Sequence, residues 1–139
     1  VKNMLRILFV LVIGAFFLNS CGPSDLVSQL GGKEWNVTSI LGKTLDANES
    51  MKGLPSVNFG EEGKLFGSTG CNNFNGSFKL DGTSLSLDPG AITKMFCPDS
   101  YEQDFLSAVK QVTNVKMDGS NLNLLNGTNS VMTLVPKVK

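Results

Sequence analysis

Closely spaced turn signals constrain the fold of this chain more than any other feature of its sequence. Asp81-Gly82, Asp118-Gly119 and Asn126-Gly127 are dipeptides typical of tight turns, and Glu62-Gly63 marks a further one. The stretches between them are short, and in several of them apolar residues alternate with polar ones, as in half-buried strands. Turns that recur about every 8–12 residues therefore predict a meander of antiparallel strands.

The first predicted strand is Glu34–Ile40, with Trp35, Val37 and Ser39 on one side. Residues 42–54 are polar and contain several glycines, so we expect a long loop there. The other predicted strands are Val57–Phe59, Lys64–Ser68, a strand with Phe74, Phe78 and Leu80 on one face, Ser84–Asp88, Ala91–Phe96, Val115–Met117, Leu122–Leu125 and Val131–Val135.

One amphipathic helix is expected among these strands. Ser100, followed three residues later by Gln103, matches a capping box at a helix start. The apolar repeat that follows predicts a helix of about 12–14 residues. The fold class is then α+β, an antiparallel sheet that curls around one helix. The apolar face of the helix consists of Tyr101, Phe105, Ala108, Val109 and Val112.

The N-terminal segment predicts export. Lys2 and Arg6 precede an uncharged apolar run, Ile7–Leu18, which is shorter than the roughly 20 residues of a membrane-spanning helix. Leu18-Asn19-Ser20-Cys21 resembles the bacterial lipobox, in which the Cys is acylated and becomes the mature N-terminus. We expect a lipoprotein signal peptide at residues 1–20, lipidation of Cys21 (with palmitate among the acyl chains), and a lipidated tether at residues 21–29 that includes a helical turn at Leu26–Leu30. Ordinary signal cleavage beside an incidental Cys is the alternative.

A lipidated Cys21 would decide where the protein resides. Acyl chains contribute roughly 0.8 kcal/mol per buried CH₂, so two or more would hold the domain on a membrane. We expect a lipid-anchored protein of the bacterial cell envelope whose domain faces the periplasm or the exterior, with the membrane as its partner. The 12 basic and 12 acidic groups balance, which argues against a nucleic-acid partner.

Two further cysteines, Cys71 and Cys97, lie in the body of the chain. In an oxidising compartment they have one possible pairing, and that bridge would stabilise the fold by roughly 3.5 kcal/mol. Free buried thiols are one alternative, since Cys often serves as a small core residue. A redox-active pair is another, although the wide spacing and the lack of a His to stabilise a thiolate speak against it.

The chain contains no His, which excludes a Ser-His-Asp triad, a Cys-His pair and a His-ligated metal site. The adjacent carboxylates of Glu61 and Glu62 do not make an acid/base pair without a defined cleft. The glycine spacing does not match a phosphate-binding loop. We therefore expect no catalytic residue, no metal and no cofactor, and a protein that is not an enzyme.

The most distinctive segment is Phe66–Phe78, which contains the run Gly-Cys-Asn-Asn-Phe-Asn-Gly and is followed by the run Thr-Lys-Met-Phe-Cys at residues 93–97. Together they resemble the META domain family, which includes the HslJ-like heat-shock lipoproteins and places Gly-Cys-Asn-x-Phe-x-Gly before Thr-x-Met-Ala-Cys. Phe96 departs from the family's Ala. The resemblance covers residues 30–136. The matching motif positions are Gly70, Cys71, Asn72, Phe74, Gly76, Thr93, Met95 and Cys97, supported by Trp35, Glu102 and Phe105.

The resemblance implies a small domain with one helix packed across a mostly antiparallel curved sheet of short strands, half- or cracked-barrel-like. It also implies bacterial envelope membership and an association with envelope or heat stress, but no known catalytic activity. Taken from the residues alone, the motif is structural: its glycines permit unusual backbone angles, and Asn72 and Asn73 bond to nearby backbone. Cys71 and Cys97 would tie a strand turn to the segment that enters the helix.

These observations favour a non-enzymatic envelope lipoprotein that contributes to stress tolerance. The alternative is a carrier or pilot-like chaperone, in which a groove between helix and sheet holds an apolar ligand or a segment of an envelope protein partner. The aromatic residues expected to supply such a groove are Phe59, Phe66, Phe74, Phe78 and Phe105.

Overall fold

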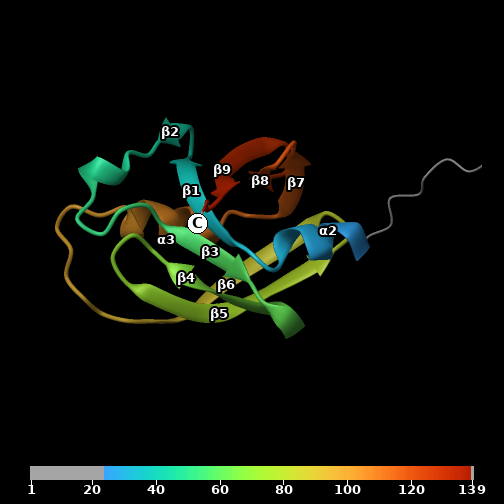
Figure 1. Cartoon of the computed structure of the whole chain (residues 1–139), viewed down its shortest axis with the longest axis horizontal. Coiled ribbons are helices and arrows are strands. Elements are labelled where there is room, and N and C mark those ends of the chain that lie inside the picture. The colour runs from blue at the N-terminus through green and yellow to red at the C-terminus, as the bar shows by residue number, and fades with distance from the viewer. Residues whose placement is uncertain (1–23, 139) are drawn as a thin grey trace, which may run out of the picture.

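The computed structural model describes residues 24–138, and Figure 1 shows its arrangement. The predicted signal peptide and Cys21 lie outside the described residues. Two α-helices and nine strands make up the described part. In chain order they are α2 (Ser24–Leu30), β1 (Glu34–Ile40), β2 (Lys43–Thr44), β3 (Ser56–Phe59), β4 (Lys64–Ser68), β5 (Asn73–Asp81), β6 (Ser84–Ile92), α3 (Glu102–Val109), β7 (Asn114–Asp118), β8 (Asn121–Asn126) and β9 (Asn129–Pro136).

The strands form one antiparallel sheet that curves back on itself. Neighbours follow the order β2-β1-β3-β4-β5-β6-β7-β8-β9, and β1 also pairs with β9. The joint between β6 and β7 is weak, because Ser84 and Asn114 are the one register pair that joins them. The result is a cracked barrel, not a clean one, and the predicted α+β fold class with its mostly antiparallel curved sheet is confirmed.

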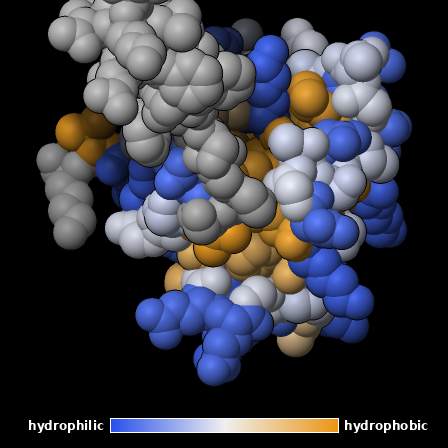
Figure 2. All heavy atoms as spheres, turned by 90° about the vertical axis from the view of Figure 1, so that its right-hand side faces the viewer, coloured by the Kyte–Doolittle hydropathy of each residue, from blue (hydrophilic) through white to orange (hydrophobic). Residues whose placement is uncertain are grey.

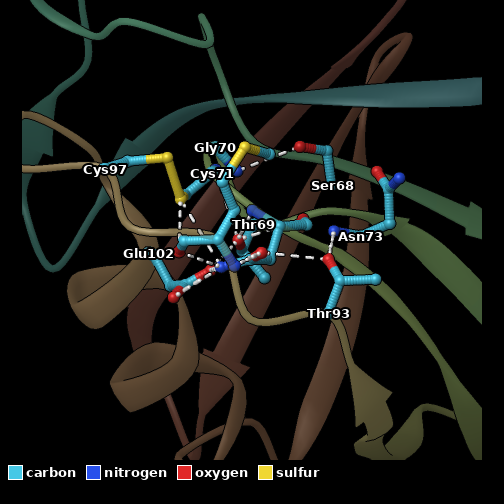
Figure 3. Close-up of a disulfide and its surroundings, with 10 residues drawn as sticks. Ser68, Thr69, Gly70, Cys71, Asn73, Thr93, Cys97 and Glu102 are labelled. Carbon is cyan, nitrogen blue, oxygen red and sulfur yellow. Dashed lines mark hydrogen bonds between the residues drawn. A yellow bond between two sulfur atoms is a disulfide. The ribbon is translucent and has the colours of Figure 1, made fainter.

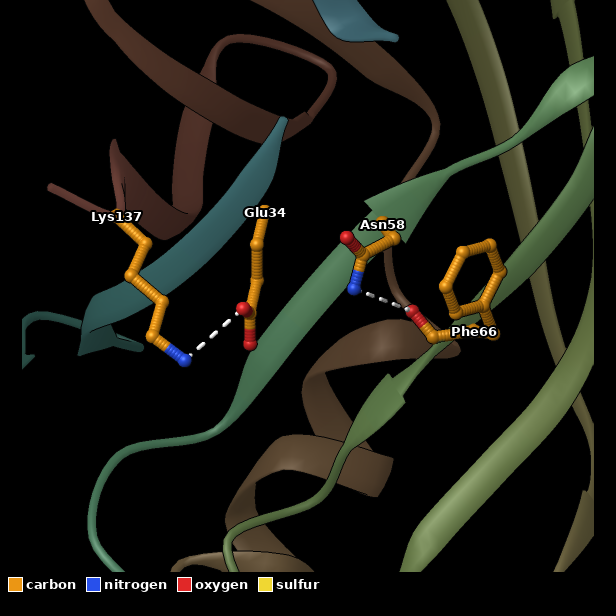
Figure 4. Close-up of polar contacts among 4 residues, drawn as sticks. All are labelled: Glu34, Asn58, Phe66 and Lys137. Carbon is orange, nitrogen blue, oxygen red and sulfur yellow. Dashed lines mark hydrogen bonds and ion pairs between the residues drawn. The ribbon is translucent and has the colours of Figure 1, made fainter. Parts of the chain in front are cut away.

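The junction of β1 and β9 brings the two ends of the domain together (Figure 4). Lys137 Nζ lies 2.9 Å from Glu34 Oε2, and the Lys137 backbone N–H donates to the Glu34 carbonyl at 2.8 Å. The hydrogen bond from Lys137, with a second from Ser56, holds the pKa of Glu34 below its ordinary value. On the neighbouring strands, Asn58 Nδ2 donates to the Phe66 carbonyl at 3.4 Å.

Helix α3 packs against the inner face of the sheet. Its Phe105 is fully buried, and the Phe105 ring lies 5.6 Å from that of Phe74 on β5. Trp35 on β1 is also fully buried, and its Nε1 donates to the carbonyl of Leu30 at the end of α2 at 2.9 Å. Helix α2 is thereby fixed to the barrel, and the part of the predicted tether that the structure describes is helical from Ser24 onwards.

The phenylalanines expected to line a groove serve mainly as core. Phe59, Phe74 and Phe105 are buried, and Phe78 packs against the core with its ring 5.1 Å from that of Phe59. Phe66 is 44% exposed and lies on the outside of β4. Of these phenylalanines, Phe78 also lines a small groove of about 280 Å³ between β5 and β6.

Helix α3 is shorter than the predicted helix, and the capping box predicted at Ser100 and Gln103 is not formed. Helix α3 covers Glu102–Val109, its N-cap is Tyr101, and no side chain caps it. The Tyr101 hydroxyl instead donates to the Asp46 carbonyl at 2.9 Å, so a long-range contact fixes the start of the helix. All the residues of the predicted apolar face are buried in the core. Val112 lies beyond the end of the helix but still packs against the same core.

Two bulges alter the predicted strands. A register shift between Val37 and Ser39 turns Ile40, and not Ser39, to the inside of β1. A second shift at Phe74 allows β6 to continue through the Pro89-Gly90 dipeptide to Ile92, whereas residues 93–96 are not strand. Gly76 is required here, since a Cβ at that position would lie 2.0 Å from the Asp88 carbonyl oxygen. The long loop expected at residues 42–54 contains β2 and a short 3-10 turn at Ala47–Glu49.

Candidate functional site

The two motif segments meet next to the start of α3 (Figure 3). Residues 69–72 form the turn between β4 and β5, and residues 93–101 form the connection from β6 to α3. A disulfide joins Cys71 in the turn to Cys97 in the connection, with their Cα atoms 5.9 Å apart. The turn and the segment that enters the helix are therefore covalently linked, in the pairing that the sequence allowed.

Asn72 is the centre of this site, and its side chain is 2% exposed. Its Oδ1 accepts hydrogen bonds from the Met95 backbone N–H at 2.6 Å and from Thr93 Oγ1 at 3.0 Å. Its Nδ2 donates to the Met95 carbonyl at 3.0 Å and to the two oxygens of Glu102 at 3.1 and 2.9 Å. The amide thus uses its donors and its acceptor, as a buried polar group must.

Thr69 supports the same site from the other side. Its hydroxyl, which is fully buried, accepts from the Asn72 backbone N–H at 2.9 Å and donates to Glu102 Oε2. Its own backbone N–H donates to the Asn72 carbonyl at 2.8 Å, which closes the turn. We refer to Thr69, Asn72, Thr93 and Glu102 as the Asn72 cluster. Thr69 is a site residue that was not predicted from the sequence, although Thr followed three residues later by Asn is a pattern that favours a local turn.

Glu102 supplies the charge of the cluster. Burial is the largest single influence on its carboxyl group and opposes ionisation, but hydrogen bonds from Thr69 and Asn72 together outweigh it and hold the pKa of Glu102 below its ordinary value. Glu102 is also in the first turn of α3, where a negative charge is favourable to the helix dipole. The carboxylate is therefore ionised at neutral pH.

The remaining motif residues have structural roles. The Gly70 backbone N–H donates to Ser68 Oγ at 3.1 Å within the turn, and Phe74 is in the core against Phe105. Thr93 Oγ1 accepts from the Asn73 backbone N–H at 3.0 Å, which attaches the connection to β5. The sequence-predicted positions are thus brought together around one turn, apart from Phe74 and Gly76, which lie further along β5.

A groove of about 380 Å³ lies beside the Asn72 cluster. Phe96, 87% exposed, and Met95, 50% exposed, form its apolar part. Figure 1 places this connection, drawn in gold, at the end of the domain opposite to α2. The groove is lined by Asn72, Ile92, Thr93, Lys94, Met95, Phe96 and Glu102.

Two other grooves flank the weak joint between β6 and β7. One, of about 390 Å³, has Leu80, Leu85 and Val112 among its lining residues. The other, of about 300 Å³, lies between α2 and β7 and includes Leu26 and Met117. Figure 2 views this side of the domain and shows apolar atoms gathered between polar edges.

Within residues 24–138, no cluster of three or more Asp, Glu or Cys side chains is arranged to hold a metal ion. No helix in the same range is both long and apolar enough to cross a bilayer. The polar groups of the Asn72 cluster bond mainly to one another and to backbone, so the arrangement holds a surface loop in place.

Comparison with known proteins agrees with this architecture. A sequence model described as META domain matches residues 28–139. One solved NMR structure is 27% identical, with a TM-score of 0.60, and the match covers 78% of this chain and 92% of the other. An NMR structure of a protein from Burkholderia xenovorans is 18% identical, with a TM-score of 0.63 and coverage of 90% and 94%. No curated protein matches this chain.

Proposed function

This chain belongs to the META domain family, and on that basis we propose that it is a non-enzymatic, lipid-anchored module of the bacterial envelope that contributes to envelope or heat stress tolerance. The family assignment rests on nearly the whole of the folded domain. The anchor, the location and the stress role are our inference from the N-terminal sequence and from the way the domain is built.

The observation that carries the proposal is the use of the motif residues in the Asn72 cluster. The side chain of Asn72 forms its hydrogen bonds with the Met95 backbone, with Thr93 and with Glu102. A catalytic site instead leaves a nucleophile or a general base free to reach substrate. The disulfide between Cys71 and Cys97 also suits a protein that works in an oxidising compartment.

The position of Cys21 fits an anchor. It precedes Ser24, the first residue of α2, by three positions, which allows a span of at most about 11 Å. Because residues 93–101 lie at the opposite end of the domain (Figure 1), an anchored domain would direct this connection away from the membrane. A surface held in that way is accessible to partners in the envelope.

Expression of the full chain in a bacterium tests the anchor. Cells would be grown with an alkyne-bearing palmitate analogue, and the chain would be compared with a Cys21→Ser variant by labelling and by membrane fractionation. We expect label and membrane association for the natural sequence and neither for Cys21→Ser. Equal labelling of both, or none, would refute the anchor. Survival of a deletion strain after heat shock, with and without the restored gene, tests the stress role.

A second candidate function is the carriage of an apolar ligand. It is favoured by the groove of about 390 Å³ at the weak β6–β7 joint, whose lining includes the half-buried Leu80 and the buried Leu85 and Val112. Native mass spectrometry of the chain purified from the envelope would test it. We expect a bound adduct that is absent in a Leu80→Lys variant; a ligand-free mass, or an adduct that survives the substitution, would count against carriage.

A further inference from the structure

We propose that the groove beside Glu102 is a binding site for a ligand that carries a protonated amine or a guanidinium group next to an apolar group. This inference goes beyond the proposed function, because it does not require Cys21 to be lipidated. It rests on three features of one surface: a carboxylate without a cationic partner, two exposed apolar side chains, and a loop that is fixed on both sides of them.

The first feature is the charge of Glu102. Its hydrogen-bond partners, Thr69 and Asn72, are both neutral. Among residues 24–138 the ion pair that the structure forms joins Lys137 to Glu34, at another site. Glu102 therefore brings a negative charge to the groove and forms no ion pair with a cationic side chain among residues 24–138. A cation that enters the groove would supply a counter-charge, in surroundings that screen charge less than bulk water does.

The second feature is the apolar surface beside that charge. Phe96 is 87% exposed and Met95 is 50% exposed, and both line the groove together with the half-buried Ile92. Most exposed apolar residues on a small domain need no explanation. Met95 and Phe96, however, are consecutive and lie on the rim of a groove that contains a carboxylate. This combination matches a ligand with an apolar body and a cationic end, since an aromatic ring also attracts cations.

The third feature is the rigidity of the loop. The Met95 backbone is bound through its N–H and its carbonyl to Asn72, at 2.6 and 3.0 Å. Cys97 is bound to Cys71 by the disulfide. Phe96 lies between these two attachment points. A ligand that binds a preorganised surface does not have to supply the free energy of ordering it, which is how small contact areas reach useful affinity.

Lys94 makes a sharp test possible. It lines the same groove and is exposed, and it forms no ion pair with Glu102 in the structure. A cationic ligand would be repelled by the Lys94 ammonium and attracted by the Glu102 carboxylate. Removal of the two charges should therefore change affinity in opposite directions. The groove volume of about 380 Å³ suits a dipeptide or a small amine.

NMR titration of the full chain in mild detergent would test the site, with backbone amide shifts of Met95, Phe96 and Glu102 as the signal. The probes are N-acetyl-arginyl-phenylalanine amide and phenethylamine, and the neutral control is the same dipeptide with citrulline in place of arginine. Binding of the dipeptide alone would identify a polypeptide segment as the source of the ligand. Equal binding of phenethylamine would identify a small amine.

We expect Glu102→Gln to weaken binding about tenfold or more, Phe96→Ala to weaken it several-fold, and Lys94→Gln to tighten it several-fold. Lys116→Gln, an exposed charge on β7, is the matched control and should have no effect. If Glu102→Gln fails to fold, Phe96→Ala and Lys94→Gln, which change exposed side chains, still test the proposed site. The proposal is overturned if neither probe shifts these amides, if citrulline serves as well as arginine, or if Phe96→Ala and Lys94→Gln leave binding unchanged.

Discussion

The side-chain amide of Asn72 donates to both carboxylate oxygens of Glu102, at 3.1 and 2.9 Å, although the two residues are 30 positions apart in the chain. This contact joins the turn between β4 and β5 to the first turn of α3. The amide simultaneously binds the Met95 backbone in the intervening connection. One buried side chain therefore fixes three segments that no regular secondary structure holds together.

The Asn72 amide should be among the most sensitive positions of the fold. Asn72→Ala removes a buried amide together with its hydrogen bonds to Glu102, Thr93 and Met95, and we expect the free energy of unfolding to fall by about 2–4 kcal/mol. Asn72→Asp should cost at least as much, since it adds a second carboxylate next to Glu102. Asn73→Ala is the control, because the Asn73 side chain is exposed, and should cost less than about 0.5 kcal/mol. Urea denaturation would measure all three, and equal effects at Asn72 and Asn73 would contradict the role of the amide.

The disulfide should stabilise the domain mainly through the unfolded state. It closes a loop between residues 26 positions apart, which predicts a loss of about 3.5 kcal/mol in the Cys71→Ala/Cys97→Ala double variant. Denaturation of oxidised and reduced natural protein beside this variant would measure the loss. The reduced protein and the double variant should agree within about 1 kcal/mol. A double variant as stable as the oxidised protein would show that the bridge contributes no stability.

Gly67 on β4 should not tolerate a side chain. A Cβ there would lie 2.0 Å from the Ser56 carbonyl oxygen on β3, so Gly67→Ala forces two paired strands apart. We expect a loss of at least about 2 kcal/mol in the free energy of unfolding. Gly31→Ala is a matched control, since its nearest neighbours would lie 3.6 Å away, at ordinary contact distance. Thermal denaturation would compare the variants, and similar melting temperatures would contradict this account.

Acid should destabilise the protein through Glu102. The pKa of Glu102 is lowered in the folded state, so its contribution is fully present above its ordinary pKa of about 4.5 and is lost as the pH falls through the lower folded value. The stability difference between the natural protein and Glu102→Gln should therefore be largest at neutral pH and should shrink below pH 4.5. Urea titrations at several pH values would measure it, with Glu61→Gln, an exposed turn carboxylate outside the cluster, as control. A difference that grows in acid would reverse the assigned sign.

The strand meander was predictable because its signals are local. Strand β4 falls on the predicted residues, and the hairpins at Asp81-Gly82, Asp118-Gly119 and Asn126-Gly127 turn where the dipeptides indicate. Such turns depend on the backbone preferences of two adjacent residues, and the strand faces depend on an alternation of period two. Both can be derived from a sequence without knowing what the strands pair with.

The errors arose where distant contacts override local ones. The capping box at Ser100 and Gln103 is absent because the Tyr101 hydroxyl is bound to Asp46, far away in the sequence. The faces of β1 change where a bulge adjusts its register to β9. Strand β6 continues through Pro89-Gly90 because a second bulge accommodates that dipeptide, which in isolation suggests the end of a strand.

The candidate site was only half predictable for the same reason. The motif residues around Cys71 and Cys97, and the one pairing open to these cysteines, could be derived from the sequence. The link from Thr69 through Asn72 to Glu102 could not, because each hydrogen bond joins side chains whose spacing in the chain has no periodic meaning. Nor could the groove, because its residues come from β6, from the connection and from α3.

By itself, the sequence determined the class of fold, most of its strands and turns, and its buried helix face, since turn propensities and hydrophobic periodicity act over a few neighbouring residues. The tertiary structure decided that the sheet closes through β1 and β9, that the joint at β6 and β7 stays weak, and that Asn72 ties the connection at Met95 to Glu102. These features depend on which distant groups can satisfy one another's hydrogen bonds and fill the same core. That competition is settled only when the whole chain packs.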